Sequence, residues 1–243
     1  MRIIKLNAID STNTYLKQIS DTEVLDDYTI VTTKSQTQGR GQRGAIWNSE
    51  KAKNLTCSVF KQGLNIAADE QFYVSIVTSL AVVKTLHSFN IPKLHVKWPN
   101  DILSENKKVC GILIENVIKN NNLVESIIGI GLNVNQTQFE GLPNASSLKI
   151  LTGTVFNLDE LLQLIPTNLK YYFEFLNSGK IEFLKAEYEQ KLFRKDKPSS
   201  FKDAKGNLFA GFIKGINSVG NLQILLEDDI LMEFDLKEIT LLY

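Results

Sequence analysis

Residues 107–135 read KKVCGILIENVIKNNNLVESIIGIGLNVN, and this stretch decides the class of fold. It contains two apolar runs, 109–118 and 125–134, which are rich in isoleucine and valine and are joined by polar residues that include KNNN. Short apolar runs of β-branched residues between turn residues are typical of buried strands. We therefore expect two buried strands here, as part of a sheet.

The segments on the N-terminal side of this pair mix strands with helices. Residues 2–20 are expected to form a short strand, a turn and a helix. The N-cap of that helix is Ser11 or Asp10, because either side chain can accept a hydrogen bond from a free helical amide. An apolar stripe at spacings of three and four residues predicts a helix over 68–89. Further short strands are expected at 28–33, 55–60 and 95–98.

Two helices are expected after the strand pair. One begins at Asn157, with Glu160 as its capping-box partner. Pro166 should break or kink this helix, because proline lacks the amide and its ring clashes with the preceding turn. Gly179 ends it, and a second helix follows over 181–193.

The pattern changes after about Arg194. Short strands follow one another closely, separated by turns such as AKGN and SVGN, which is typical of a small barrel. The predicted fold class is therefore α+β, with a mixed α+β domain over 1–193 and a small C-terminal β domain over 194–243.

Composition excludes several classes of protein. The 243 residues contain 27 basic and 27 acidic side chains, so the net charge is zero and nothing draws the whole chain toward nucleic acid or an anionic membrane. Cys57 and Cys110 lie in apolar runs and form no CxxC pair, which favours buried free thiols in a reducing compartment over a disulfide or metal framework. The sequence has no signal peptide and no run as long as a membrane span, so we expect a cytoplasmic protein.

The glycine-rich segment 36–47, QTQGRGQRGAIW, contains the letters GxGxxG at 39–44. A dinucleotide fingerprint needs a helix directly after it, but the residues that follow have no helical apolar stripe, so we reject that interpretation. Its glycines allow close approach to a ligand, and Arg40 and Arg43 can meet carboxylate or phosphate oxygens while Trp47 stacks on a flat ring. The alternative is a solvated basic loop with a buried tryptophan.

Three further segments carry polar residues at strand ends. KWPND places Lys97, Asn100 and Asp101 after a strand, although a simple Asx turn would look the same. Lys108 opens an apolar strand, and strict alternation puts it on the face of Cys110, whereas Gly111 leaves room for a ligand on the other face. Lys108 could equally be an exposed lysine at a strand start.

The fourth segment, GIGLNVN, has glycines inside a strand, which marks either the close approach of a ligand or a β-bulge. Asn133 within it could donate or accept hydrogen bonds with an adenine or a phosphate. His87 and His95 have no cysteine or carboxylate at metal-binding spacing, so we interpret both as structural and expect no protein-held metal ion.

Taken in order, QxxGRGxxGxxW, KWPND, KKxxGILIE and GIGLNVN resemble the signature series of the biotin–protein ligases, and DSTN at 10–13 matches as well. The resemblance spans nearly the whole chain. It implies a mixed sheet of the class II synthetase type flanked by helices, with an SH3-like C-terminal barrel. It also implies an enzyme that activates biotin with ATP to biotinyl-5'-adenylate, releases pyrophosphate, and transfers biotin to a lysine of a biotin carboxyl carrier domain.

The resemblance also assigns roles to residues. Lys108, Arg40 and Asp101 would be catalytic, and Arg43, Trp47, Lys97, Asn100 and Asn133 would serve ATP or the adenylate. Mg²⁺ would arrive mainly on the ATP phosphates. The biotin-binding residues would be Ser11, Thr12, Asn13, Gln36, Gly39, Arg40, Gly41, Gln42, Lys108, Gly111 and Gly129.

This chain departs from the family pattern inside the loop. Many relatives have arginine at the positions of Gln42 and Ala45, and the loss of those cations should weaken the grip on the α-phosphate. Arg43 is expected to compensate, so that Arg43→Ala would speed the escape of biotinyl-adenylate. Family members occur as monomers and homodimers, and some carry an N-terminal helix-turn-helix; there is no room for one before Arg2, so we expect no operator binding.

Three rivals remain on the sequence alone. A lipoate–protein ligase or octanoyltransferase shares the fold but uses a different glycine-rich motif with a nearby histidine. A binding module that lost turnover is disfavoured by the presence of Lys108 and Asn133. A nicotinamide dehydrogenase is disfavoured by the missing helix after the glycine-rich loop.

Overall fold

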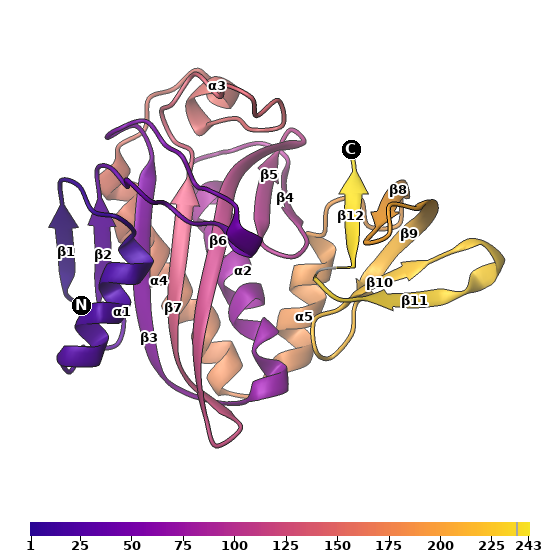
Figure 1. Cartoon of the computed structure of the whole chain (residues 1–243), viewed down its shortest axis with the longest axis horizontal. Coiled ribbons are helices and arrows are strands. Elements are labelled where there is room, and N and C mark those ends of the chain that lie inside the picture. Colours follow the sequence, from indigo (N-terminus) through magenta and orange to yellow (C-terminus); the bar gives the residue numbers. More distant parts are fainter. Residues whose placement is uncertain (237) are drawn as a thin grey trace.

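The computed structural model describes residues 1–236 and 238–243, and the side chains of Arg43 and Asn65 lie outside its described part. A seven-stranded mixed sheet forms the larger part of the molecule, in the order β1-β2-β3-β7-β6-β5-β4 (Figure 1). Only β1 and β2 pair in parallel among the described strands of this sheet, and all its other pairings are antiparallel. The strands are β1 (Ile3–Leu6), β2 (Ile30–Thr33), β3 (Leu55–Ala67), β4 (Leu94–Lys97), β5 (Asp101–Ser104), β6 (Lys107–Lys119) and β7 (Asn122–Leu132).

Helices cover the two faces of this sheet unequally. The helices α2 (Phe72–Ser88) and α4 (Leu158–Asn177) lie behind the sheet in Figure 1, and α5 (Ile181–Gln190) packs against these two helices beside the sheet; all three contribute to the main apolar core. The helix α1 (Thr12–Thr22) lies on the opposite face, where Leu16 packs with Val31, Phe60 and Ile127 in a smaller core. The loop at 36–47 crosses the upper part of that second face in Figure 1.

Short helical segments complete this part of the chain. They are η1 (Gln42–Gly44), η2 (Ala68–Glu70) and α3 (Leu148–Thr152). Ser11 caps α1, because its side chain accepts a hydrogen bond from the amide of Thr14. This cap fixes the first turn of α1 against the sheet, which matters for the site because Thr12 and Asn13 belong to that turn.

The C-terminal strands form a second, antiparallel sheet in the order β11-β10-β9-β8-β12. They are β8 (Pro198–Asp203), β9 (Leu208–Ile216), β10 (Leu222–Leu225), β11 (Leu231–Phe234) and β12 (Ile239–Leu242), with η3 (Glu227–Asp229) between β10 and β11. Trp98 Nε1 donates to the carbonyl of Gly220 at 2.9 Å, and a side-chain oxygen of Glu189 accepts from the amide of Ile216 at 3.0 Å. These contacts attach the second sheet beside β4 and α5.

The structure confirms the α+β class and the strand pair that predicted it. β6 and β7 run longer than the two apolar runs, and β3 extends well beyond 55–60. Gly179 has a φ of +71° just after α4, as a helix-ending glycine should. The described pairings make an open five-stranded sheet, and β12 was missing from the predicted strands. The proposed division at 193 and 194 stays a prediction.

Two local predictions do not hold as made. The helix α4 continues through the buried Pro166, so the predicted break is wrong, while the alternative of a kink stays a prediction. The Asn157 side chain caps α4 by accepting from the amide of Asp159. No described hydrogen bond from the Glu160 side chain completes the predicted capping box.

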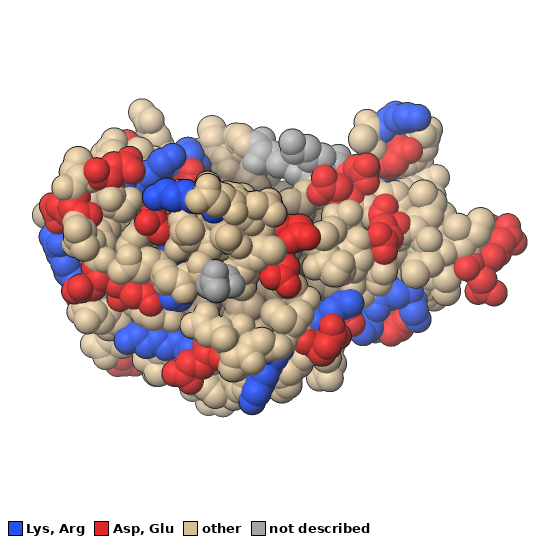
Figure 2. Space-filling model, turned by 90° about the horizontal axis from the view of Figure 1, so that it is seen from below, with Lys and Arg blue, Asp and Glu red and all other residues tan. Residues whose placement is uncertain are grey.

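The basic and acidic side chains are equal in number, so the net charge is zero. On the face shown in Figure 2, basic and acidic side chains are interspersed, and the far end of the β10–β11 hairpin is acidic. No helix in the described part of the chain is both long and apolar enough to cross a membrane.

Candidate active site

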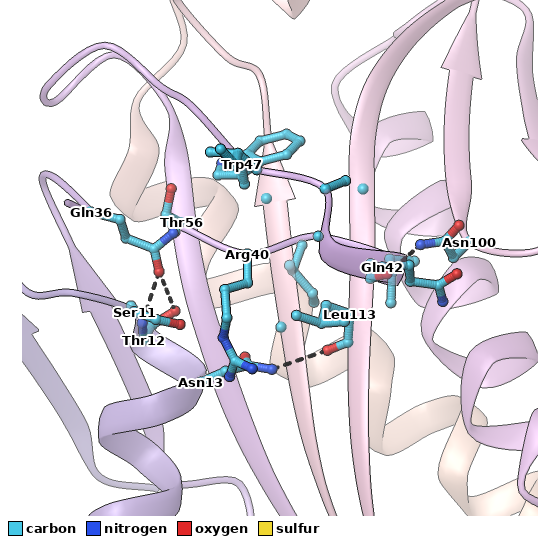
Figure 3. A pocket seen from close by; sticks show the side chains of 18 of the residues that line it. Ser11, Thr12, Asn13, Gln36, Arg40, Gln42, Trp47, Thr56, Asn100 and Leu113 are labelled. Atoms are coloured by element: carbon cyan, nitrogen blue, oxygen red, sulfur yellow. Dashed lines mark hydrogen bonds between the residues drawn. The ribbon is translucent and has the colours of Figure 1, made fainter. Parts of the chain in front are cut away.

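A cavity of about 170 Å³ lies between the second face of the large sheet and the glycine-rich loop (Figure 3). Its walls come from α1, from the loop and from β3, β5, β6 and β7. The cavity collects many of the residues that the sequence motifs singled out, although they are far apart in the chain. Its polar and aromatic lining side chains are Ser11, Thr12, Asn13, Gln36, Arg40, Gln42, Trp47, Thr56, Asn100, Asp101 and Lys108.

The loop over the cavity is ordered as a small hairpin, and we call residues 39–47 the lid. Trp47 N donates to Gly39 O at 2.9 Å, and Gly41 N donates to Ala45 O at 2.7 Å. Just before the lid, backbone hydrogen bonds tie residues 37 and 38 to residues 9 and 10. The lid is therefore held at its base by the segment that leads into α1.

The ring of Trp47 rests on a trench made by two glycines. Gly111 on β6 and Gly131 on β7 are register partners, so the sheet lacks two neighbouring side chains at this point. A Cβ atom on Gly131 would lie 2.5 Å from Trp47 Cε2, and one on Gly111 would lie 3.4 Å from Trp47 Cζ3. Trp47 Nε1 is buried and has no hydrogen-bond partner in the described structure. The glycines of GILIE and GIGLNVN thus make room for this indole.

A fixed row of polar groups lines the end of the cavity nearest α1. Gln36 Oε1 accepts from the Thr12 amide at 2.8 Å and lies 3.1 Å from Thr12 Oγ1. Ser58 Oγ lies 2.7 Å from Thr12 Oγ1 and 2.5 Å from Asn13 Oδ1. Asn13 crosses β7 over Gly129, where a Cβ atom would meet Asn13 Oδ1 at 2.4 Å. Buried groups held in this way can recognise a small polar ring by its donors and acceptors.

Lys108 and Asp101 form an ion pair in the wall of the cavity. Lys108 Nζ lies 2.6 Å from Asp101 Oδ1. The angles of this contact are not those of a hydrogen bond, so the attraction is that of an ion pair. The Lys108 side chain reaches to within 3.4 Å of the position that a Cβ on Gly111 would take. Lys108 therefore shares a face with Gly111, and the predicted shared face with Cys110 is wrong.

A β-bulge explains this difference. On β5 the register advances by one residue, from Ile102 to Leu103, while its partner on β6 changes from Cys110 to Lys108. Val109 is thus the extra residue of the bulge, and it is buried in the main core together with Cys110. One inserted residue turns the ammonium of Lys108 from the helix side of the sheet to the cavity side.

Three other predicted site residues are absent from the described lining of this cavity, and a fourth, Asn100, lines it. Lys97 lies outside this cavity, with Nζ 4.8 Å from the Tyr243 ring centre, and its burial lowers the pKa of its ammonium. Asn100 lines the cavity but donates its amide to Ile112 O at 2.6 Å. Asn133 is buried and is absent from the described lining. Gly39, the first residue of the lid, is absent from the described lining, and a Cβ atom there would clash with Trp47 O.

A second cavity, of about 220 Å³, adjoins the first. Gln42, Asn100 and Asp101 line both cavities. Apart from Lys97, the remaining walls of the second cavity are largely apolar and come from Trp98 and Pro99, from the segment that follows α5, and from the C-terminal strands and the loop before β12. Asp101 thus lies where the two spaces meet.

Some residues of the site were not predicted, and one predicted residue cannot be placed. Thr56 and Ser58 come from the 55–60 strand, where polar and apolar residues alternate, and that alternation could have revealed them. Glu115 was quoted in the family motif but was given no role. The Arg43 side chain lies outside the described part of the structure, so its role stays a prediction.

Comparison with known proteins shows which family the chain belongs to. The profile of the biotin/lipoate A/B protein ligase family matches residues 6–133. The chain is 33% identical over 138 residues to the bifunctional ligase/repressor BirA of Escherichia coli, covering 56% of this chain and 41% of the relative. It is 32% identical over 122 residues to the biotin–[acetyl-CoA-carboxylase] ligase of Paracoccus denitrificans, covering 49% of this chain and 48% of that protein.

A solved structure is similar over the whole length. The biotin protein ligase of Aquifex aeolicus, in complex with biotin and ATP, superposes with a TM-score of 0.80 at 26% identity, covering 99% of this chain and 98% of that one. The sequence matches to the two curated relatives span less than half of each relative's own length. Because the family profile covers more than half of the chain and the whole fold is similar to a solved ligase, the chain belongs to the biotin/lipoate A/B protein ligase family.

Proposed function

We propose that this protein is a biotin–protein ligase, which activates biotin with ATP and transfers it to a lysine on a biotin carboxyl carrier domain. One observation carries the proposal. A single lidded cavity brings the polar row of Ser11, Thr12, Asn13 and Gln36 together with the Lys108–Asp101 pair. The similar Aquifex structure contains biotin and ATP, which are the two ligands that such a cavity would need to hold.

In the first step a biotin carboxylate oxygen attacks the α-phosphorus of ATP. A new P–O bond forms, the bond to the β-phosphate oxygen breaks, and pyrophosphate leaves. Lys108 is proposed to bind both the carboxylate and the attacked phosphate, which reduces the repulsion between two anions. Holding the two reactants together under the lid supplies the rest of the rate enhancement through orientation.

In the second step the acceptor lysine amine attacks the carbonyl carbon of the mixed anhydride, and AMP leaves. The amine must be neutral to attack, so its proton has to be removed. Asp101 lines both cavities and is proposed to bind the incoming ammonium group and to accept the proton that it loses. The apolar walls of the second cavity suit the four methylene groups of a lysine side chain.

Mg²⁺ is proposed as a companion of ATP. No group of three or more His, Cys, Asp or Glu residues within the described part of the chain could hold a metal ion. Asp101, which is the carboxylate in the cavity wall, is already paired with Lys108. We therefore propose that Mg²⁺ enters on the nucleotide phosphates.

The test is isotope exchange between pyrophosphate and ATP, measured with biotin, with lipoate or octanoate, and without a carboxylic acid. Exchange that depends on biotin supports the proposal, and dependence on lipoate or octanoate would assign the chain to the other branch of its family. Incubation with a carrier domain, followed by detection of protein-bound biotin, tests the second step. Sequence-specific binding in a salt-controlled gel shift would contradict the expected lack of an operator function.

A further inference from the structure

Glu115 connects the lid to the sheet without lining the cavity. It lies on β6, four residues beyond Gly111, and is not among the described residues of the cavity wall. Arg40 Nη2 lies 3.1 Å from both Glu115 Oε1 and Oε2, and it donates to Thr14 Oγ1 at 3.2 Å. Asn13 Nδ2 donates to Glu115 Oε2 at 2.8 Å. One carboxylate therefore joins the lid, α1 and the sheet.

Arg40 is well placed to control the opening of the lid. It belongs to the first arm of the hairpin, where it forms an antiparallel bridge with Ile46. Figure 3 shows its side chain crossing from the lid to the sheet, beside Asn13 and Leu113. The base of the lid is held by backbone hydrogen bonds that need not break when the hairpin lifts. The Arg40–Glu115 contact, in contrast, spans the gap between the lid and the sheet, and this gap has to widen when the lid opens.

We propose that Glu115 is a positioning residue that holds the lid closed through Arg40 and thereby slows the escape of the activated intermediate. This inference rests on the proposed ligase function. Glu115 acts through Arg40, because it contacts the lid and α1 while the cavity wall is formed by other residues. The pair is partly exposed, at 46% for Arg40 and 29% for Glu115, so its effect on release is roughly two- to five-fold.

The test compares Glu115→Gln with Glu115→Asp and with the parent enzyme. The glutamine keeps a carbonyl that can accept from Asn13 and removes the charge that attracts Arg40, whereas aspartate keeps the charge. Enzyme loaded with radiolabelled biotin and ATP is diluted into unlabelled substrates, and the appearance of free biotinyl-adenylate is followed. We expect release to accelerate roughly two- to five-fold in Glu115→Gln, with partial recovery in Glu115→Asp and little change in the rate of adenylate formation.

The control is Glu105→Gln, which removes a similar ion pair, Lys93 Nζ to Glu105 Oε2 at 2.9 Å, among residues outside the cavity wall. It should leave release unchanged. In an Arg40→Gln background the Glu115→Gln effect should vanish, because no guanidinium remains to be held. A release rate that is unchanged by Glu115→Gln, or an effect that persists without Arg40, would overturn the inference.

The same experiment separates this inference from the proposed function. If the parent enzyme shows no biotin-dependent exchange of pyrophosphate, the ligase proposal fails and the inference fails with it. If exchange is normal but release does not respond to Glu115→Gln, the ligase proposal stands and the role of Glu115 is refuted.

Discussion

Lys108 is the residue on which the chemistry of the site most depends. Its ammonium lies in the wall of the cavity, paired with a single carboxylate, and Gly111 beside it leaves space for a ligand. Its neighbour Lys107 reaches out of the cavity to the carbonyl of Pro143 at 2.7 Å. The two lysines are therefore a matched pair that differ mainly in position.

Lys108→Gln should lower kcat/KM for adenylate formation by about 10- to 100-fold, since a hydrogen bond to a charged group contributes about 1.5–3 kcal/mol. Lys107→Gln should leave it nearly unchanged. Steady-state exchange of pyrophosphate into ATP measures both variants. Equal losses in the two variants would show that the position of Lys108 at the cavity carries no special role.

Gly131 is the second decisive residue, because its missing side chain makes the trench for Trp47. In Gly131→Ala the new methyl would lie 2.5 Å from Trp47 Cε2, so the indole must rise off the sheet. We expect a red-shifted tryptophan emission and faster loss of the bound intermediate. The variant Trp47→Phe identifies which part of the emission belongs to this ring, and an unchanged spectrum would contradict the packing described.

At the scale of elements, the bulge in β6 shows what a sequence pattern can and cannot predict. The positions of β6 and β7 follow from their apolar runs of β-branched residues between polar turns, although β6 is only partly buried along most of its length. The face of Lys108 does not follow, since alternation assumes a regular strand and one extra residue at Val109 reverses it. The motif residues were found by resemblance, while the pairing of Arg40 with Glu115 needed the folded sheet.

Trp98 shows the same limit in another way. It belongs to the KWPND motif, yet its ring joins the large sheet to the C-terminal sheet through Gly220 O. A sequence motif shows that certain residues occur next to one another in the chain, but it does not show which of their side chains face a ligand. Lys97, next to it, likewise faces the second cavity and Tyr243.

Trp98→Phe should therefore lower the free energy of unfolding by about 0.5–1.5 kcal/mol more than Trp47→Phe does. Both changes shrink an indole to a phenyl ring, but Trp98 loses a hydrogen bond of 2.9 Å, whereas the Trp47 nitrogen has no partner in the described structure. Thermal and urea unfolding measure the difference. Faster proteolysis between α5 and β8 in Trp98→Phe would show that the C-terminal sheet has loosened, and equal stabilities would contradict the proposed attachment.

At the scale of the whole molecule, the two histidines give stability a pH dependence. Burial, with the nearby charges of Lys197 and Lys191, lowers the pKa of His95 below its ordinary value of 6.5. Burial, with Lys191, lowers the pKa of His87 in the same direction. The unfolded chain therefore binds protons at a higher pH than the folded chain does, so stability is complete above about pH 6.5 and falls as the pH drops toward the folded pKa.

We expect the midpoint temperature of thermal unfolding to decrease when the pH is lowered from about 8 to about 5.5, which is the range where histidine titrates. Replacing both histidines by glutamine should flatten this part of the profile. Differential scanning calorimetry of the parent and the double variant makes the comparison. A parent midpoint that rises on acidification would have the wrong sign for two histidines whose pKa is lowered in the folded chain.

The ion pair of Lys108 with Asp101 and that of Arg40 with Glu115 mean that the resting enzyme carries its own counter-ions. An anionic substrate that pairs with the ammonium of Lys108 has to displace the carboxylate of Asp101, which is already paired with it. The displaced Asp101 is left in need of a cation, and in the proposed reaction the next cation to arrive is the ammonium of the acceptor. Binding of the first substrate would thus strengthen the attraction of Asp101 for the second, so that the charge balance of the site would favour the order of the two proposed half-reactions.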